Sequence, residues 1–221
     1  HHDPAAHSKT RPASALGQPI YDGLEQGRIE AVGDTIAVLL VITDPPDPLA
    51  DLARRIAGHD RVLSSGTFLD SLRFRFHLGK KLGVDPKSVE AQVIGEHGTS
   101  QVYLWSTARV AGTAIAPDDT IRHEVEDEVR YANISIIEGT GASRLGIGVV
   151  AARMAEMIER NEGTVVPIGS YQESFGVTLS LPSQFGREGI TRVLMPALAE
   201  DEARALDESA ATLRRALRSI E

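Results

Sequence analysis

Three side chains in this sequence could together move a proton and hold an anion, namely Asp70, Arg73 and His97. A histidine transfers protons near neutral pH, an aspartate can orient it and stabilise its cation, and an arginine can bind a carboxylate through two parallel hydrogen bonds. These groups suit a small acid that carries an oxidisable hydroxyl. On residue type alone the alternative stays open: Asp70 and Arg73 form a surface ion pair three residues apart on a helix, and His97 is a structural histidine in a turn.

Length, net charge and composition restrict the classes of protein to which this chain can belong. The 221 residues can bury a real core and allow one or two domains. A net charge of −8 with scattered lysines and arginines argues against a nucleic-acid partner. The absence of cysteine excludes disulfides, thiolate metal sites and a cysteine nucleophile, and we predict no metal site. No apolar run approaches the roughly 18 residues that a membrane span needs, so we expect no membrane association.

The sequence starts at His1 and lacks the basic and then apolar layout of a signal peptide. We read this start as a truncated, processed or tagged end. A cytoplasmic protein is therefore the expectation.

The elements that must position the three side chains alternate between strands and helices. Hydrophobic periodicity predicts strands at residues 36–42, 61–66, 91–98, 101–112, 164–170 and 177–185, and helices at 48–58, 67–83, 119–133 and 142–163, with a final helix that ends near residue 220. The run at 36–42 is typical of a strand buried on both faces of a parallel sheet. The strands at 164–170 and 177–185 are expected to pair.

Two helices have a predicted buried side. The helix at 67–83 would bury Leu69, Leu72, Phe76 and Leu82. The last helix has apolar residues at spacings of four, three, four and three, which indicates an amphipathic helix docked on a core. These residues are Leu206, Ala210, Leu213, Leu217 and Ile220.

The stretch "SSGTFLDSLRFRFHLGKKLGVDPKSVEAQVIGEHGTSQVYLWS", residues 64–106, resembles the core of the L-lactate and L-malate dehydrogenase family. It is most similar to the L-lactate and L-2-hydroxyacid members. The resemblance continues upstream in "LLVITDPPDPLADLA" and downstream in "IIEGTGASRLGIG" and "LSLPSQFGREGI". It implies an α/β fold in which residues 1–66 form the C-terminal part of a Rossmann-type parallel sheet, the incomplete NAD-binding domain, and residues 67–221 form an α+β catalytic domain.

The resemblance also implies roles in an NAD-dependent 2-hydroxyacid dehydrogenase. His97 would be the proton donor and acceptor, Asp70 its partner, and Arg73 the anchor of the substrate carboxylate. Ser65 would lie near the nicotinamide carboxamide and Ile147 against the nicotinamide ring. Residue type alone leaves helix capping open for Ser65 and core packing open for Ile147.

Three further positions are compared with the family's substrate site. Ser143 stands where lactate-type members carry a threonine beside the substrate, so a hydroxyl is retained. Arg11 falls about where the family's carbonyl-polarising loop arginine would lie, although its flanking residues do not support the match. Asp44, in "TDPPD", replaces an asparagine whose amide donates a hydrogen bond to the reacting substrate oxygen.

The family's Gly-rich turn and the acidic residue that follows it, which hold the pyrophosphate and ribose of NAD, are not in this sequence. We therefore expect the N-terminal part of the cofactor domain to be missing here, whether truncated, disordered or truly absent. Two alternatives stay open besides a lactate-type enzyme: an L-malate dehydrogenase, and a degenerate paralogue that serves as a binding or assembly protein. The expected partners are a small 2-hydroxy or 2-keto acid and further copies of the chain, in a homodimer or homotetramer.

Overall fold

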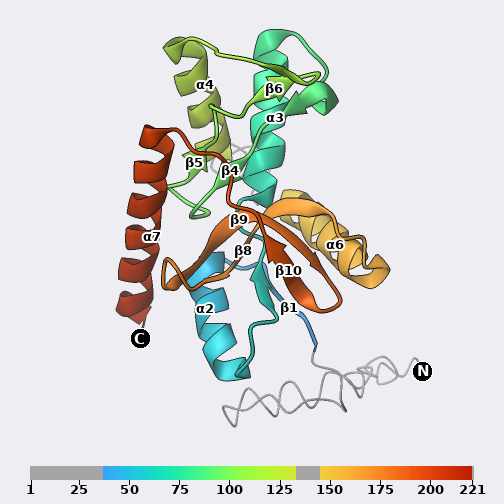
Figure 1. Ribbon diagram of the computed structural model, residues 1–221, viewed down its shortest axis with the longest axis vertical. Helices are drawn as coiled ribbons and strands as arrows, with labels where there is room; N and C mark the ends of the chain where they lie inside the picture. Colours follow the sequence, from blue (N-terminus) through green and yellow to red (C-terminus); the bar gives the residue numbers. More distant parts are fainter. Residues whose placement is uncertain (1–36, 133–144, 221) are drawn as a thin grey trace, which may run out of the picture.

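The computed structural model describes residues 37–132 and 145–220. Its helices and strands follow one another in the order shown in Figure 1. The strands are β1 (Leu39–Val41), β2 (Val62–Ser64), β3 (Val89–Glu90), β4 (Val93–Ile94), β5 (Val102–Tyr103), β6 (Arg109–Val110), β7 (Thr113–Ala114), β8 (Val165–Gln172), β9 (Val177–Gly186) and β10 (Gly189–Val193). The helices are α2 (Pro46–Ala57), α3 (Phe68–Leu82), α4 (Asp119–Arg130), α6 (Leu145–Arg160) and α7 (Glu200–Ile220), with a short 3₁₀ turn at Pro86–Ser88.

A five-stranded sheet organises most of the described chain, in the order β1-β2-β8-β9-β10. β1 and β2 are parallel, as expected, whereas β8, β9 and β10 join them as antiparallel strands. The predicted pairing of β8 with β9 is confirmed. Because β2 bonds to β8 through Ser64 and Gly169, the sheet continues from residues before position 66 into those after it. The mixed α/β architecture agrees with the expected fold class.

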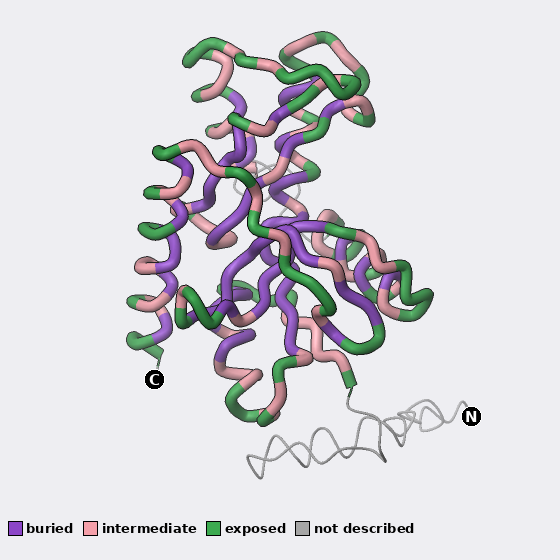
Figure 2. The backbone as a smooth tube through the Cα atoms, viewed as in Figure 1, coloured by how far each residue is buried: buried purple, intermediate pink, exposed green. Residues whose placement is uncertain are grey.

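Helices cover both faces of this sheet. In Figure 1, α2 and α7 lie on one side and α6 on the other, while α3 and α4 extend away from it together. The buried parts of the tube in Figure 2 follow the sheet and the inward sides of these helices. Among the described helices, none combines the length and the apolar character that a membrane span needs.

Two predictions about burial are wrong. β1 is only half-buried along its length, because it lies at an edge of the sheet that the described residues form. On α3, Leu72 and Phe76 are exposed, and the helix instead buries Phe74 and Leu78. The inward stripe of α3 also contains the small polar Ser71, which escapes a pattern based on large apolar side chains alone.

Ser71 can be buried because its hydroxyl has local partners. It donates to the carbonyl of Thr67 at 2.9 Å and accepts from the backbone N–H of Val93 at 2.9 Å. These bonds tie the first turns of α3 to β4, the strand that leads into the histidine loop. On α7 the predicted stripe is buried from Leu206 to Leu217, and only its last member, Ile220, is exposed.

Candidate active site

The loop between β4 and β5 carries His97, and the protein holds it at both ends. Gly95 exchanges two backbone hydrogen bonds with Ser180 of β9, at 2.8 and 2.9 Å. Its φ of 83° is left-handed, and a Cβ there would lie 2.6 Å from the hydroxyl of Ser209 on α7, so glycine is required. The same hydroxyl accepts from the N–H of Glu96 at 2.8 Å. The backbone before His97 is therefore fixed to the sheet and to α7.

The structure brings Asp70, Arg73 and His97 together. Asp70, in the first turn of α3, is buried, and its Oδ2 lies 2.5 Å from Nδ1 of His97. Its other oxygen, Oδ1, lies 3.5 Å from a terminal nitrogen of Arg73. Asp44 approaches from the end of β1, with Oδ1 3.8 Å from Nε2 of His97. Because Asp70 contacts both neighbours, it orients the imidazole and the guanidinium at once.

These four side chains line one pocket with a volume of about 350 Å³. The described residues around it are Asp44, Pro45, Asp70, Arg73, His97, Gly98, Gln101 and Arg130. The lining is mostly polar or charged, and two arginines face the same space. Such a pocket suits a small anion better than an apolar ligand.

The charges around His97 favour its cation. Burial alone lowers the pKa of the imidazole, since desolvation disfavours the charged form. The hydrogen bond to Asp70 and the charge of that carboxylate outweigh this effect, and the nearby charges of Asp47 and Asp44 act in the same direction. The pKa of His97 rises from 6.5 to about 9 as a result. At neutral pH His97 is therefore a proton donor.

Sequence reasoning missed two charged residues at this site. Arg130, at the end of α4, lines the pocket, but in a helix with many charges nothing in the sequence distinguishes it. Asp47, three residues after Asp44, is buried and accepts a hydrogen bond from the backbone N–H of His97 at 3.0 Å. The only available signal for Asp47 was a charged residue in the first turn of a helix, which is also typical of ordinary helix starts.

The two residues that the resemblance assigns to the cofactor, Ser65 and Ile147, are described but are not among the residues that line this pocket. Ser65 is buried where β2 ends, and its N–H donates to the carbonyl of Val41 at 3.0 Å. It does not cap α3, whose N-cap is Thr67. Ile147 is half-buried in the first turn of α6, next to Gly146, where a Cβ would lie 3.4 Å from Leu69 of α3. The first turns of α6 and α3 are therefore in contact beside Asp70.

Ser143 and Arg11, the two remaining predicted substrate residues, lie outside the described residues. Within the described ranges, no group of three or more histidine, aspartate or glutamate side chains is arranged to hold a metal ion.

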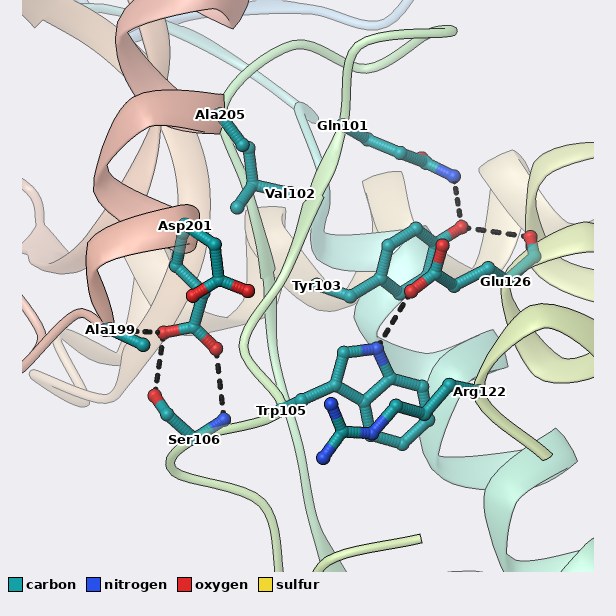
Figure 3. Close-up of a pocket in the computed structure, with 11 residues that line it drawn as sticks. Gln101, Val102, Tyr103, Trp105, Ser106, Arg122, Glu126, Ala199, Asp201 and Ala205 are labelled. Carbon is teal, nitrogen blue, oxygen red and sulfur yellow. Dashed lines mark hydrogen bonds between the residues drawn. The ribbon is translucent and has the colours of Figure 1, made fainter. Parts of the chain in front are cut away.

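A second pocket of about 350 Å³ lies between β5, α4 and the start of α7 (Figure 3). Its polar groups mostly bond to one another. The buried carboxylate of Glu202 accepts from the N–H and hydroxyl of Ser106, and Glu126 accepts from the indole N–H of Trp105 at 2.8 Å. Gln101 lines both pockets.

Comparison with known proteins places the chain in a family. Residues 67–221 match the family model of the lactate/malate dehydrogenase alpha/beta C-terminal domain. The chain is 42% identical over 195 residues to an L-lactate dehydrogenase of Chloroherpeton thalassium, covering 83% of this chain and 64% of the relative. It is 40% identical over 187 residues to an L-lactate dehydrogenase of Deinococcus radiodurans, covering 80% and 62%.

Solved structures agree with this relationship. The L-lactate dehydrogenase of Clostridium thermocellum superimposes with a TM-score of 0.77 and 36% identity, over 83% of this chain and 65% of that one. The chain thus spans less than two thirds of the length of these relatives. The family model covers most of the chain, and the identities are high over most of its length, so the chain belongs to the lactate/malate dehydrogenase family.

Proposed function

We propose that this chain is the catalytic part of an NAD-dependent L-2-hydroxyacid dehydrogenase of the lactate type. The observation that carries the proposal is the bond between Nδ1 of His97 and Asp70, which leaves Nε2 on the side of the pocket that Arg73 also lines. A proton donor and a carboxylate anchor therefore face the same small space. The relatives named L-lactate dehydrogenase support the substrate class.

In the direction of reduction, Arg73 binds the carboxylate of a 2-keto acid through its two-pronged guanidinium. The imidazolium of His97 donates a hydrogen bond from Nε2 to the ketone oxygen. When bound, NADH supplies the hydride that reaches the carbonyl carbon. As negative charge develops on the oxygen, His97 transfers its Nε2 proton, and the neutral imidazole stays oriented by the bond from Nδ1 to Asp70.

Within residues 37–132 and 145–220, the proposed cofactor contacts fit the nicotinamide end of NAD. The carboxyl ends of the parallel strands β1 and β2 meet at one edge of the sheet, where Asp44 and Ser65 follow them. Crevices at such edges hold nucleotide cofactors in open α/β sheets. In the proposal, Ser65 and Ile147 contact the nicotinamide. The division into a cofactor part at 1–66 and a catalytic part at 67–221 stays a prediction from the family resemblance.

A dicarboxylic 2-keto acid, as in a malate dehydrogenase, is the second candidate substrate. The observation in its favour is Arg130, a second arginine on the same pocket. A homodimer or homotetramer stays a prediction from the family resemblance, and a cytoplasmic location stays a prediction from the sequence near His1, which lacks the layout of a signal peptide.

The test is a pair of substitutions, assayed in the protein together with its nucleotide-binding region. His97→Asn should abolish turnover and leave cofactor binding nearly unchanged, because only the proton donor is lost. Arg73→Lys should mainly raise KM, because an ammonium cannot make the two parallel hydrogen bonds. Normal turnover after His97→Asn would rule out the proposed function.

A further inference from the structure

A buried carboxylate lies directly behind the catalytic histidine. Asp47, in the first turn of α2, is only 1% exposed, and its two oxygens have different partners. Oδ1 accepts from the hydroxyl of Ser64 on β2 at 2.5 Å, and Oδ2 accepts from the backbone N–H of His97 at 3.0 Å. One side chain thus connects the start of a helix, the end of a strand and the histidine loop.

A glycine in the sheet leaves room for this carboxylate. Gly169 of β8 lies opposite Ser64 in the sheet. A Cβ on Gly169 would lie 2.5 Å from Oδ1 of Asp47, and closer still to the hydroxyl of Ser64. Any side chain at position 169 would therefore displace the Ser64–Asp47 pair, so the sheet itself is built around it.

A carboxylate in this position is costly to ionise. Burial raises the pKa of Asp47 from 3.8 to about 6, although the bonds from Ser64 and His97 and the positive charge of His97 oppose the shift. The other charged neighbour, Glu96, raises it slightly further. Because Asp47 also raises the pKa of His97, each of the two groups titrates under the influence of the other.

We propose that Asp47 is a positioning residue for His97, which fixes the backbone of the histidine loop and couples its own ionisation to the charge of the imidazole. Asp70 orients the imidazole of His97 through a hydrogen bond to its side chain, whereas Asp47, on α2, accepts a hydrogen bond from its backbone N–H. The link to catalysis rests on the proposed function. The coupling between the two groups does not, and it can be measured without cofactor or turnover.

The test is an NMR titration of the imidazole nitrogens of His97 in the ¹⁵N-histidine-labelled chain between pH 4 and 10, assigned by loss of the signals in His97→Asn. In the parent chain the main step should lie near pH 9, with a smaller step near pH 6 as Asp47 loses its proton. Asp47→Asn keeps an acceptor for the N–H of His97 but cannot ionise. It should remove the smaller step and lower the pKa of His97 by about half a unit or more.

The matched control is Asp51→Asn. Asp51 lies one turn further along α2, is equally buried, and accepts from the backbone N–H of Thr178 at 3.0 Å. If the loss of a buried carboxylate on α2 changed the His97 titration only by disturbing the fold, both variants would show the same change. The proposal requires the His97 titration to change in Asp47→Asn alone. The same titration curve in folded Asp47→Asn and in the parent would overturn it.

A second variant keeps the proposal falsifiable if Asp47→Asn does not fold. Ser64→Ala removes a hydrogen bond that lowers the pKa of Asp47, so the smaller step should move to higher pH. If that step stays in place, the titrating group is not Asp47. An unchanged His97 titration contradicts the coupling, whereas normal turnover of His97→Asn would overturn only the proposed function and leave the coupling measured in the parent intact.

Discussion

Nδ1 of His97 and Oδ2 of Asp70 lie 2.5 Å apart, although the two residues come from a loop and a helix separated by 27 positions in the chain. Asp70 is almost fully buried, and His97 is about a quarter exposed toward the pocket. The bond therefore fixes one imidazole nitrogen inside the protein and leaves the other available to a substrate. Its strength sets the proton affinity of the site.

Asp70→Asn should move the basic limb of 2-keto acid reduction to lower pH. The hydrogen bond to Asp70 and its charge make the largest contributions that raise the pKa of His97, and an amide carries no charge to replace them. We expect the limb near pH 9 to fall by about one unit or more, in a profile of kcat/KM against pH. Asp207→Asn, an exposed aspartate on α7, is the control. Equal profiles for all three proteins would contradict the assigned partner.

The stability of the chain should also depend on the charge of His97. Its folded pKa, about 9, lies above the 6.5 of an unfolded histidine, so the stabilisation is fully present below pH 6.5 and is lost as pH rises through 9. The parent should lose up to about 3 kcal/mol in free energy of unfolding across this window, relative to His97→Asn. Urea unfolding at pH 6 and pH 9.5 measures the difference. If the free energies of unfolding of the two proteins differ by the same amount at pH 6 and at pH 9.5, the pKa of His97 is not raised.

The three side chains that meet at the pocket, Asp70, Arg73 and His97, could be picked out because their signals are local. Asp70 and Arg73 lie one turn apart on α3, and Gly95, two residues before His97, has a left-handed φ of 83°. The alternation that predicts β8 and β9 is local as well. β10 was not predicted, since its five residues include an arginine and a threonine and follow a glycine turn, so no apolar alternation marks them.

The groups that support the site could not be predicted in this way. The contact between Asp47 and His97 spans 50 positions, and it depends on how α2 docks against the sheet. The burial of Ser71 depends in the same way on the backbone of β4. Polar residues whose partners come from distant segments have no periodic signature, so the sequence indicates the residues that line the pocket better than those that hold them in place.

Arg130 should discriminate between substrates. Among the described residues none accepts a hydrogen bond from its buried Nε, and the carboxylates that pair with its terminal nitrogens, on Glu126 and Asp127, are 3.8 Å away. Because the partly exposed guanidinium of Arg130 lines the pocket, a second carboxylate on the substrate would pair with it. Arg130→Gln should therefore raise KM for a dicarboxylic 2-keto acid about tenfold, and that for pyruvate much less.

The control for this comparison is Arg122→Gln on the same helix. Arg122 lines the second pocket, and its Nε donates to the carbonyl of Pro117 at 3.0 Å. It should leave both KM values unchanged. An equal effect of Arg130→Gln on the two substrates would show that Arg130 acts on the pocket in general and not on a second carboxylate.

Asp44 should limit the rate of reduction. Its side chain is 83% exposed, and Oδ1 lies 3.8 Å from Nε2 of His97, on the side where the substrate oxygen would bind. An ionised carboxylate only accepts hydrogen bonds, and its charge opposes the negative charge that develops on the ketone oxygen. An amide in the same place can donate. Since one such donor is typically worth about 10²–10³ in rate, Asp44→Asn should speed reduction of pyruvate and longer 2-keto acids at neutral pH by a sizeable part of that factor.

Asp60→Asn is the matched control, because Asp60 is 80% exposed and pairs with Arg54 beyond the far end of α2. If Asp44→Asn leaves kcat unchanged or lowers it while Asp60→Asn has no effect, then the carboxylate of Asp44 has a positive role, as an acceptor for a substrate that brings its own donor.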